Sequence, residues 1–461
     1  MLYSNRTSWV TQRVMASTSF HFVFMLSWEV FPFSVNKFAY GLTAGSLLLI
    51  HMSFVKKIDL WLIGICLARA GTGLVLITYA AALPIVQKEW GMSAAEGGSI
   101  SSGNQFAYAI SLVIFSSLAD LWGAKRVFLG SMIAGGLAAL AFALFARDYS
   151  SALILYALVG FALGGSYTTG LMLLTERYDT ARRGMAMGYF IASTSAGYAF
   201  CLVVTGLVLP IGGYKLSFLL TCLGAPIGAG LAWLTLWRTP NTVAQRQTQR
   251  GVARLISENK PAMLLIAGYT FHAWELLGMW AWTPAFLAAC FALGGGGDLK
   301  AAGMGAYVTA FFHFTGMLAS YSMGFLSDRW GRGTVLLGLA GISTFCSFLF
   351  GWTYGWPLTV TVALGALYAF SSPGDSPVLS AALSEAVDLA YLGSAFGVRS
   401  LLGYCAGAAA PLVFGLILDW TNPDNVGAPY GNWGWAFSSL GLMGSGAVAA
   451  ALLYKKGTRK C

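Results

Sequence analysis

The stretch Ser116 to Leu129, SSLADLWGAKRVFL, returns about 208 residues later as Met323 to Leu336, MGFLSDRWGRGTVL. In each copy an apolar run leads into Leu-x-Asp-x-x-Gly, so that Asp120 corresponds to Asp328. A carboxylate at this point can cap the N-terminus of a following helix. The pattern predicts a very tight turn between two apolar helices, formed twice in one chain.

The remaining residues of the two copies support the same interpretation. Gly123 and Gly331 allow a positive φ or a close backbone approach, and basic residues lie beside them, Lys125 and Arg126 in the first copy and Arg329 and Arg332 in the second. Cations in a short loop mark the cytoplasmic face of a membrane protein. Two copies at a fixed offset resemble the signature loop between helices 2 and 3 of the major facilitator superfamily.

The composition places the chain in a membrane. Hydrophobic residues make up 57% and charged residues 10%, against roughly 25% charged in a soluble domain. The net charge of +10 resides in short clusters between apolar runs, which indicates orientation signals rather than nucleic-acid binding. Six of the seven cysteines lie in or beside apolar segments without a C-x-x-C, so no disulfide framework or zinc site is indicated.

The apolar runs from residue 60 onward predict an all-α membrane protein with twelve transmembrane helices. Each run is near or above the length needed to cross ~30 Å of hydrocarbon. The predicted spans are 60–83, 97–119, 127–146, 151–175, 184–210, 215–237, 261–290, 302–325, 333–354, 357–380, 393–418 and 431–454.

A second repeat extends the internal symmetry. Glu176-x-x-Asp179-x4-Gly184 recurs as Glu385-x-x-Asp388 with a glycine again five residues on, at offset 209. The resemblance implies two parallel six-helix repeats around a central cavity lined by spans 1, 4, 7 and 10. The predicted domains are an extension 1–56, an N-terminal bundle 57–238, a cytoplasmic linker 239–260, a C-terminal bundle 261–455 and a tail 456–461.

The first residues fit neither a span nor a signal peptide. The apolar runs within 1–51 are short or interrupted by Glu29 and Pro32, whereas Met52 followed by SFVKKID resembles a cytoplasmic N-terminus. Our hypothesis is that translation begins at Met52, and the alternative is a weakly ordered extension that skims the membrane. An intact mass that includes residues 1–51 contradicts the first.

The loop charges predict the orientation. Eighteen Lys and Arg lie on the side of the two signature loops and four on the other. This bias predicts that both termini are cytoplasmic. The Ala- and Gly-rich spans with short loops suggest a bacterial inner membrane.

Arg69 is the first candidate for a ligand site, because an ionisable side chain at membrane depth indicates function by default. It is the tenth residue of span 1, about 14 Å into the membrane. Its planar donor fork suits a carboxylate or another anion. The alternative is an interhelical ion pair or hydrogen bond that only orders the bundle.

His272 and Glu275 in span 7 are the candidates for proton coupling. They share a helix face at i and i+3, and a buried carboxylate beside an imidazole can load and release a proton. The alternative, compatible with the first, is that Glu275 neutralises Arg69 across the two bundles.

Polar residues at comparable depth could hold a ligand. His313 and Gln105 occupy equivalent positions in the two repeats, and Tyr167 and Thr168 supply hydroxyls in span 4. The alternative for all of them is packing or bonding to their own backbone. We expect Trp280 and Trp282 to belong to the interfacial aromatic belt.

A gate is predicted toward the cytoplasmic end. Asp375 lies between two prolines in span 10 and Arg399 at similar depth in span 11, which suggests a pair that opens and closes, or else a static ion pair. The resemblance implies that the charged loops lock the outward-open state. The residues assigned to this role are Asp120, Gly123, Lys125, Arg126, Glu176, Asp328, Gly331, Arg332 and Glu385.

We therefore expect a monomeric secondary active transporter that moves a small polar, anionic metabolite by alternating access coupled to protons. No nucleophile with its base, metal cluster or phosphate loop indicates an enzyme or a cofactor. One alternative is an efflux permease for amphipathic compounds, although Cys201 and Leu202 replace the Gly-Pro typical of the family's drug antiporters. Another is a membrane sensor or assembly scaffold that transports nothing.

Overall fold

The computed structural model describes residues 59–243, 256–295, 297–388, 391–423 and 430–458, and every regular element in these ranges is a helix. The proposed extension up to residue 56, most of the predicted linker and the end of the tail lie outside the described residues. Residues Leu60 to Cys461 form one compact unit. The all-α prediction is confirmed for the described part of the chain.

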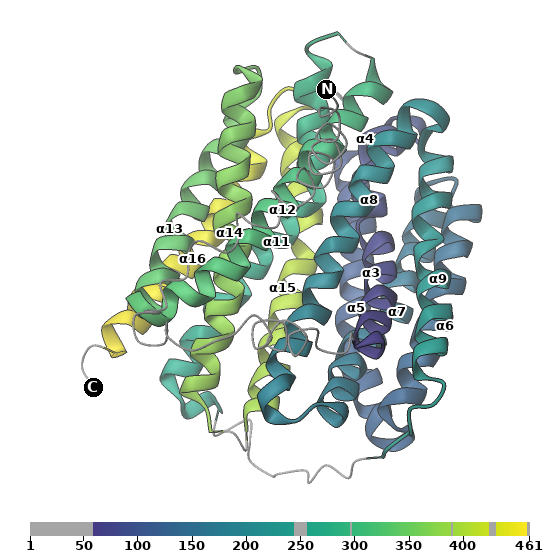
Figure 1. The fold of residues 1–461 in the computed structure, drawn as a ribbon. Helices are drawn as coiled ribbons and strands as arrows, with labels where there is room; N and C mark the ends of the chain where they lie inside the picture. The colour runs from purple at the N-terminus through teal and green to yellow at the C-terminus, as the bar shows by residue number, and fades with distance from the viewer. Residues whose placement is uncertain (1–58, 244–255, 296, 389–390, 424–429, 459–461) are drawn as a thin grey trace, which may run out of the picture. The chain divides into compact units, whose positions relative to one another are not determined.

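The first half of this unit contains seven helices, drawn from purple to teal in Figure 1. Asp148 caps the helix that follows it by accepting a 2.8 Å bond from the Ser151 backbone, which lowers the pKa of the Asp148 carboxyl. The helices are α3 (Leu60–Leu76), α4 (Thr78–Glu89), α5 (Ala94–Trp122), α6 (Ala124–Phe145), α7 (Tyr149–Arg177), α8 (Thr180–Cys222) and α9 (Gly224–Leu236).

The second half runs from green to yellow in Figure 1. Asn259 begins it as an N-cap, accepting a 3.0 Å bond from the Ala262 backbone. The elements are α11 (Lys260–Ala292), α12 (Asp298–Trp330), α13 (Arg332–Phe350), a 3-10 turn η1 (Gly351–Thr353), α14 (Leu358–Ala386), α15 (Leu392–Thr421) and α16 (Gly434–Thr458).

All twelve predicted spans coincide with helical segments. Spans 5 and 6 meet within α8, where Gly213 breaks the helix at φ 62°. Among the described residues, nine stretches are long and apolar enough to cross a membrane. The more polar α12 and α14 are not among these nine, so the number of twelve membrane crossings stays a prediction.

Both signature loops are the tight turns that the sequence predicts. Gly123 joins α5 to α6 at φ 88°, and Gly331 joins α12 to α13 at φ 83°. These conformations are strained for any residue with a side chain. Lys125 extends from the first turn to the Thr239 carbonyl, 2.7 Å away, which fixes the beginning of the linker against the first half.

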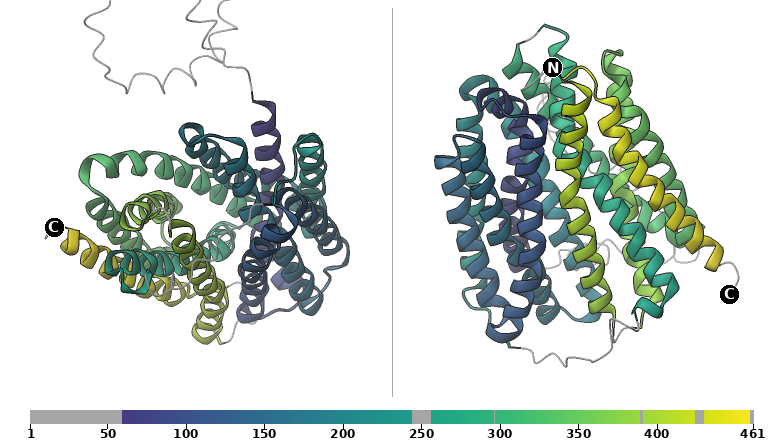
Figure 2. Two further views of the ribbon diagram at one scale, coloured as in Figure 1. Left: turned by 90° about the horizontal axis from the view of Figure 1, so that it is seen from below. Right: turned by 180° about the vertical axis from the view of Figure 1, so that it is seen from behind.

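The two halves contact each other mainly through two pairs of helices, with smaller contacts of α4 against α11 and α12. α5 packs against α15, and α8 packs against α12. Figure 2 shows α5 and α15 side by side in the view from behind. Side chains on these four helices therefore set how closely the two halves pack against each other.

Hydrogen bonds join the halves at the end that holds the α4–α5 turn. The Asp419 carboxylate, near the end of α15, accepts 2.7 Å bonds from the backbone N–H groups of Ala94 and Ala95 in the first turn of α5. Gln87 donates to the Tyr430 hydroxyl over 2.6 Å, and an ion pair links Lys88 to Asp298. We call this set the end clasp.

Asp419 places a negative charge on the positive N-terminus of a helix from the other half, a stabilising arrangement. Asp419→Asn removes the charge and replaces one acceptor oxygen by an NH₂ group. We expect the end clasp to weaken by about 1–2 kcal/mol, about tenfold in the closed-to-open ratio. Hydrogen exchange at the first turn of α5 should accelerate by this factor.

Asp298→Asn is the matched control, because it also removes an acidic partner between the halves. Its pair with Lys88 is more than half exposed on both sides, and such pairs contribute about 0–1 kcal/mol. Equal acceleration in both variants contradicts a special role for Asp419.

Candidate functional site

Arg69 is buried in the first half, with 3% of its surface exposed. Its guanidinium donates to hydroxyls on α7 and α8, over 2.8 Å to Ser166 and 2.9 Å to Thr194. Longer bonds of 3.3 and 3.4 Å reach the hydroxyls of Tyr108 and Thr72. Four helices thus position the fork by neutral groups.

The buried Arg69 guanidinium has no acidic partner within the part of the chain that the structure describes, where no ion pair within 4 Å joins it to Asp or Glu. Glu275 does not neutralise it across the bundles, so that interpretation of Glu275 is wrong for this conformation. The Tyr167 ring lies 5.3 Å from Arg69 Cζ, a cation–π arrangement that supports the charge only partly.

Glu275 is bonded inside the second half. Its Oε1 accepts 2.6 Å bonds from the hydroxyls of Ser343 and Ser347 on α13. The Ser347 hydroxyl lies 2.5 Å from that of Tyr368. The carboxyl group therefore belongs to a polar network between α11, α13 and α14.

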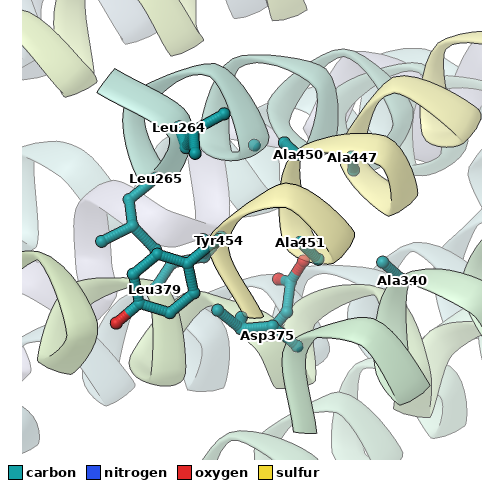
Figure 3. Close-up of a pocket in the computed structure, with 11 residues that line it drawn as sticks. Leu264, Leu265, Ala340, Asp375, Leu379, Ala447, Ala450, Ala451 and Tyr454 are labelled. Carbon is teal, nitrogen blue, oxygen red and sulfur yellow. The ribbon is translucent and has the colours of Figure 1, made fainter. Parts of the chain in front are cut away.

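His272 connects to α14 instead. Its Nδ1 lies 2.9 Å from Oδ1 of Asp375, and its Nε2 lies 3.0 Å from the Ser376 hydroxyl. Asp375 also lines a small pocket between α11, α13, α14 and α16, walled by aliphatic side chains and Tyr454 (Figure 3). His272 and Glu275 are three residues apart, yet they bond to different helices.

Arg399 is not paired with Asp375, contrary to the predicted gate pair. The carboxylate is occupied by His272, and Arg399 instead donates to the Ser380 hydroxyl over 2.8 Å. Its guanidinium stacks over the rings of Tyr269 and Phe396 at 4.3 and 4.6 Å. A gating role for either residue stays a prediction.

A cavity lies between the halves. Gln105, Tyr198 and Trp280 are among its lining residues. His313, 5% exposed, stacks on Trp280 at 3.7 Å, and its buried Nε2 finds no hydrogen-bond partner among the residues that the structure describes. Trp282 is fully buried and donates to a backbone carbonyl of α15, so its assignment to an interfacial belt is wrong.

The charged residues of the second signature loop bond to one another and to the end of α14, all within the second half of the protein. Arg332 contacts Asp328 at 2.5 Å and Glu385 at 2.8 Å. This links the second signature loop to the end of α14. Glu176 is exposed at the end of α7, and Thr168 is half-buried beside Tyr167.

Three partners of Arg69 were not identified from the sequence, and the third is Thr72 on its own helix. Thr194 and Tyr108 lie on α8 and α5, where many Ser, Thr and Tyr residues occur at similar depth. Their ring and hydroxyl positions depend on how each helix is rotated, which the apolar periodicity does not give. The Ser166 hydroxyl belongs to a segment whose polar character was visible in the sequence.

Comparison with known protein families gives the family of the chain. The model of the Major Facilitator Superfamily matches residues 60–400. The chain belongs to this superfamily. It is therefore a multi-pass membrane transporter, as predicted from its paired signature loops.

Individual relatives are distant but extensive. A hexuronate transporter of Bacillus subtilis is 24% identical over 74% of this chain and 83% of its own. The 4-hydroxybenzoate transporter PcaK of Pseudomonas aeruginosa is 24% identical over 81% and 87%. A crystal structure of a bacterial homolog of the human lysosomal transporter Spinster, inward-facing and unoccupied, aligns with a TM-score of 0.67, 15% identity and coverage of 87% and 98%.

Proposed function

We propose that the protein moves a small organic anion across the cytoplasmic membrane by alternating access, with Arg69 as the anchor for the anionic group. The observation that carries this proposal is the buried guanidinium surrounded by hydroxyls. Among the described residues, its hydrogen-bond partners are Ser166, Thr194, Tyr108 and Thr72, all neutral.

Burial without an acidic partner is unfavourable for a cation. The effective penalty is several kcal/mol per ion even after relaxation, and neutral hydroxyls offset it incompletely. An incoming carboxylate would supply the missing charge and accept two parallel N–H bonds. The bonds from Arg69 to Tyr108 and Thr72 are the longest of the set. The N–H groups of Arg69 that form them are therefore the ones that can turn to a ligand at the lowest cost.

The substrates printed in the names of two relatives are consistent with this class. Hexuronate and 4-hydroxybenzoate each carry a carboxylate, and both transporters align with most of this chain. The competing proposal, an efflux permease for amphipathic compounds, depends on the aromatic lining at Trp280 and Tyr198 and assigns Arg69 a structural role.

The arrangement of the halves supports an inward-facing state. The end clasp closes the end opposite the signature loops, and the loop charges favour a cytoplasmic position for those loops. In the proposed cycle the end clasp breaks and the cytoplasmic end closes around the bound anion. Both termini are cytoplasmic in this scheme.

Ligand-induced stabilisation of the purified protein tests the anion proposal. A ligand present at 100 times its Kd raises the free energy of unfolding by about 2.7 kcal/mol. Carboxylates should stabilise the wild-type protein and promote counterflow in proteoliposomes, whereas neutral and cationic compounds should not. Stabilisation by amphipathic cations alone contradicts the proposal.

We further propose that the His272–Asp375 pair carries the coupled proton, with Glu275 nearby in a separate network. A gradient of one pH unit corresponds to ~1.36 kcal/mol and supports about tenfold accumulation per proton. His272→Gln should abolish this accumulation and preserve anion exchange. Uptake driven by an imposed pH gradient, compared with counterflow, separates the two activities.

His313→Gln is the matched control, since it removes another buried histidine close to the cavity. We expect it to change the apparent affinity and to leave gradient-driven accumulation intact. Undiminished accumulation in His272→Gln contradicts the coupling role.

A further inference from the structure

A second buried arginine lies on the other half of the protein. Arg399 on α15 is 8% exposed, and its buried Nε has no hydrogen-bond partner within the described part of the chain. Among the described residues, no acidic side chain forms an ion pair with it within 4 Å. Its only hydrogen-bond partner found there is the neutral Ser380 hydroxyl.

Asp375, the acid predicted from the sequence to pair with Arg399, has another partner. Asp375 faces the imidazole of His272 at 2.9 Å, so the carboxylate expected to neutralise Arg399 is turned toward α11. Aromatic rings support the guanidinium at 4.3 Å from Tyr269 and 4.6 Å from Phe396. Stacked rings leave the edges of a guanidinium fork available for hydrogen bonds.

Tyrosines connect the two arginines across the interface. Tyr108 accepts a bond from Arg69 and packs against Tyr404 of α15, with ring centroids 5.5 Å apart. Tyr404 is five residues from Arg399 on the same helix. The Tyr167 ring lies 5.3 Å from Arg69 Cζ on the side of the first half.

We propose that Arg69 and Arg399 together form a site for a dianion, with one acidic group of the substrate held by each half of the transporter. This inference rests on the proposed function and narrows its substrate class to a short molecule with two anionic groups, such as a dicarboxylate. Each acidic group neutralises one otherwise unpaired buried cation. The ligand also bridges α3 and α15, so its binding favours closure of one half upon the other.

The structural alternative is that Arg399 only orders α14 and α15 through Ser380. The two roles differ in what a substitution changes. A binding role affects doubly charged ligands selectively, whereas a structural role affects every ligand alike.

The experiment compares chain-length-matched acids: succinate, glutarate and adipate against butyrate, valerate and hexanoate. Dissociation constants are measured by calorimetry on the full-length purified protein. We expect at least one dicarboxylate to bind about 10- to 100-fold more tightly than its monocarboxylate partner. Arg399→Gln should remove this advantage and leave the monocarboxylate Kd within about twofold.

Arg329→Gln is the matched control, because Arg329 also stacks on an aromatic ring of the second half, at 4.5 Å from Phe325, but is exposed. It should retain the full dicarboxylate advantage. If Arg399→Gln does not fold, Arg399→Lys keeps the charge without the fork, and part of the advantage should persist.

Three results overturn the dianion site: equal affinity for both acid series in the wild type, a dicarboxylate advantage that survives in Arg399→Gln, or an equal loss for both series in the Arg399 variant that folds. In each case monocarboxylate binding still supports the anion proposal. Absence of binding by either series in the wild type contradicts the proposed function itself.

Discussion

Arg69→Gln is expected to abolish anion transport while the protein still folds. Glutamine can retain bonds to some of the hydroxyls that surround the guanidinium, but it carries no charge. Removing one member of a buried charge pair costs about 2–5 kcal/mol, so the Kd of a carboxylate should rise at least about 30-fold. The measurements are ligand-induced stabilisation and counterflow in proteoliposomes.

Two variants make this result specific. Arg147→Gln removes an exposed arginine before α7 and should leave both measurements unchanged. Arg69→Lys keeps the charge but loses the bidentate fork, so an intermediate affinity is expected. Transport that continues at the wild-type rate in Arg69→Gln favours the amphipathic efflux alternative.

The buried charge of Arg69 should also affect the stability of the protein without ligand. A buried arginine without an acid weakens the folded state, and Gln in its place removes that penalty. We therefore expect the unliganded Arg69→Gln protein to be no less stable than the wild type. If Arg69 binds the anion, its substitution should stop transport without lowering the free energy of unfolding of the unliganded protein.

The sequence predicts the architecture well because the decisive features are local. The turns at Gly123 and Gly331 each need a glycine, and the structure places both at positive φ. The length of each apolar run fixes where a helix begins and ends within a few residues. The paired signature loops identify the superfamily, which the family comparison confirms.

The partners of the buried charged residues could not be predicted. Pairing Asp375 with Arg399, or Glu275 with Arg69, assumes a rotation for each helix about its axis. In a soluble protein an apolar stripe gives this rotation, but membrane helices are apolar on nearly every face. Only the packed structure shows that Asp375 faces His272 and that Glu275 faces α13.

Gly98→Ala should prevent the end clasp from closing. An added Cβ at Gly98 on α5 would lie 2.1 Å from the backbone carbonyl oxygen of Pro411 on α15. A backbone atom within a helix cannot move aside as a flexible side chain can. Overpacking of this kind costs about 1–3 kcal/mol, up to about 100-fold in the closed-to-open ratio.

Spin labels at Glu89→Cys and Trp420→Cys, in a cysteine-free background, should report a longer distance between the halves, and transport should fall in parallel.

Gly103→Ala provides the matched control on the same helix, because the close contact of its Cβ would be with the tip of the Leu153 side chain at 3.0 Å, and Ala157 lies at an ordinary 3.9 Å. That side chain can rotate away, so the label distance and the transport rate should stay near those of the parent protein. The comparison isolates closure of this end from folding, since both substitutions raise helix propensity equally by replacing Gly with Ala. If Gly98→Ala transports at the parent rate with an unchanged distance, the α5–α15 contact is not a moving part of the cycle. A longer distance with lost transport instead means that the close backbone approach at Gly98 is what permits the inward-facing state to form.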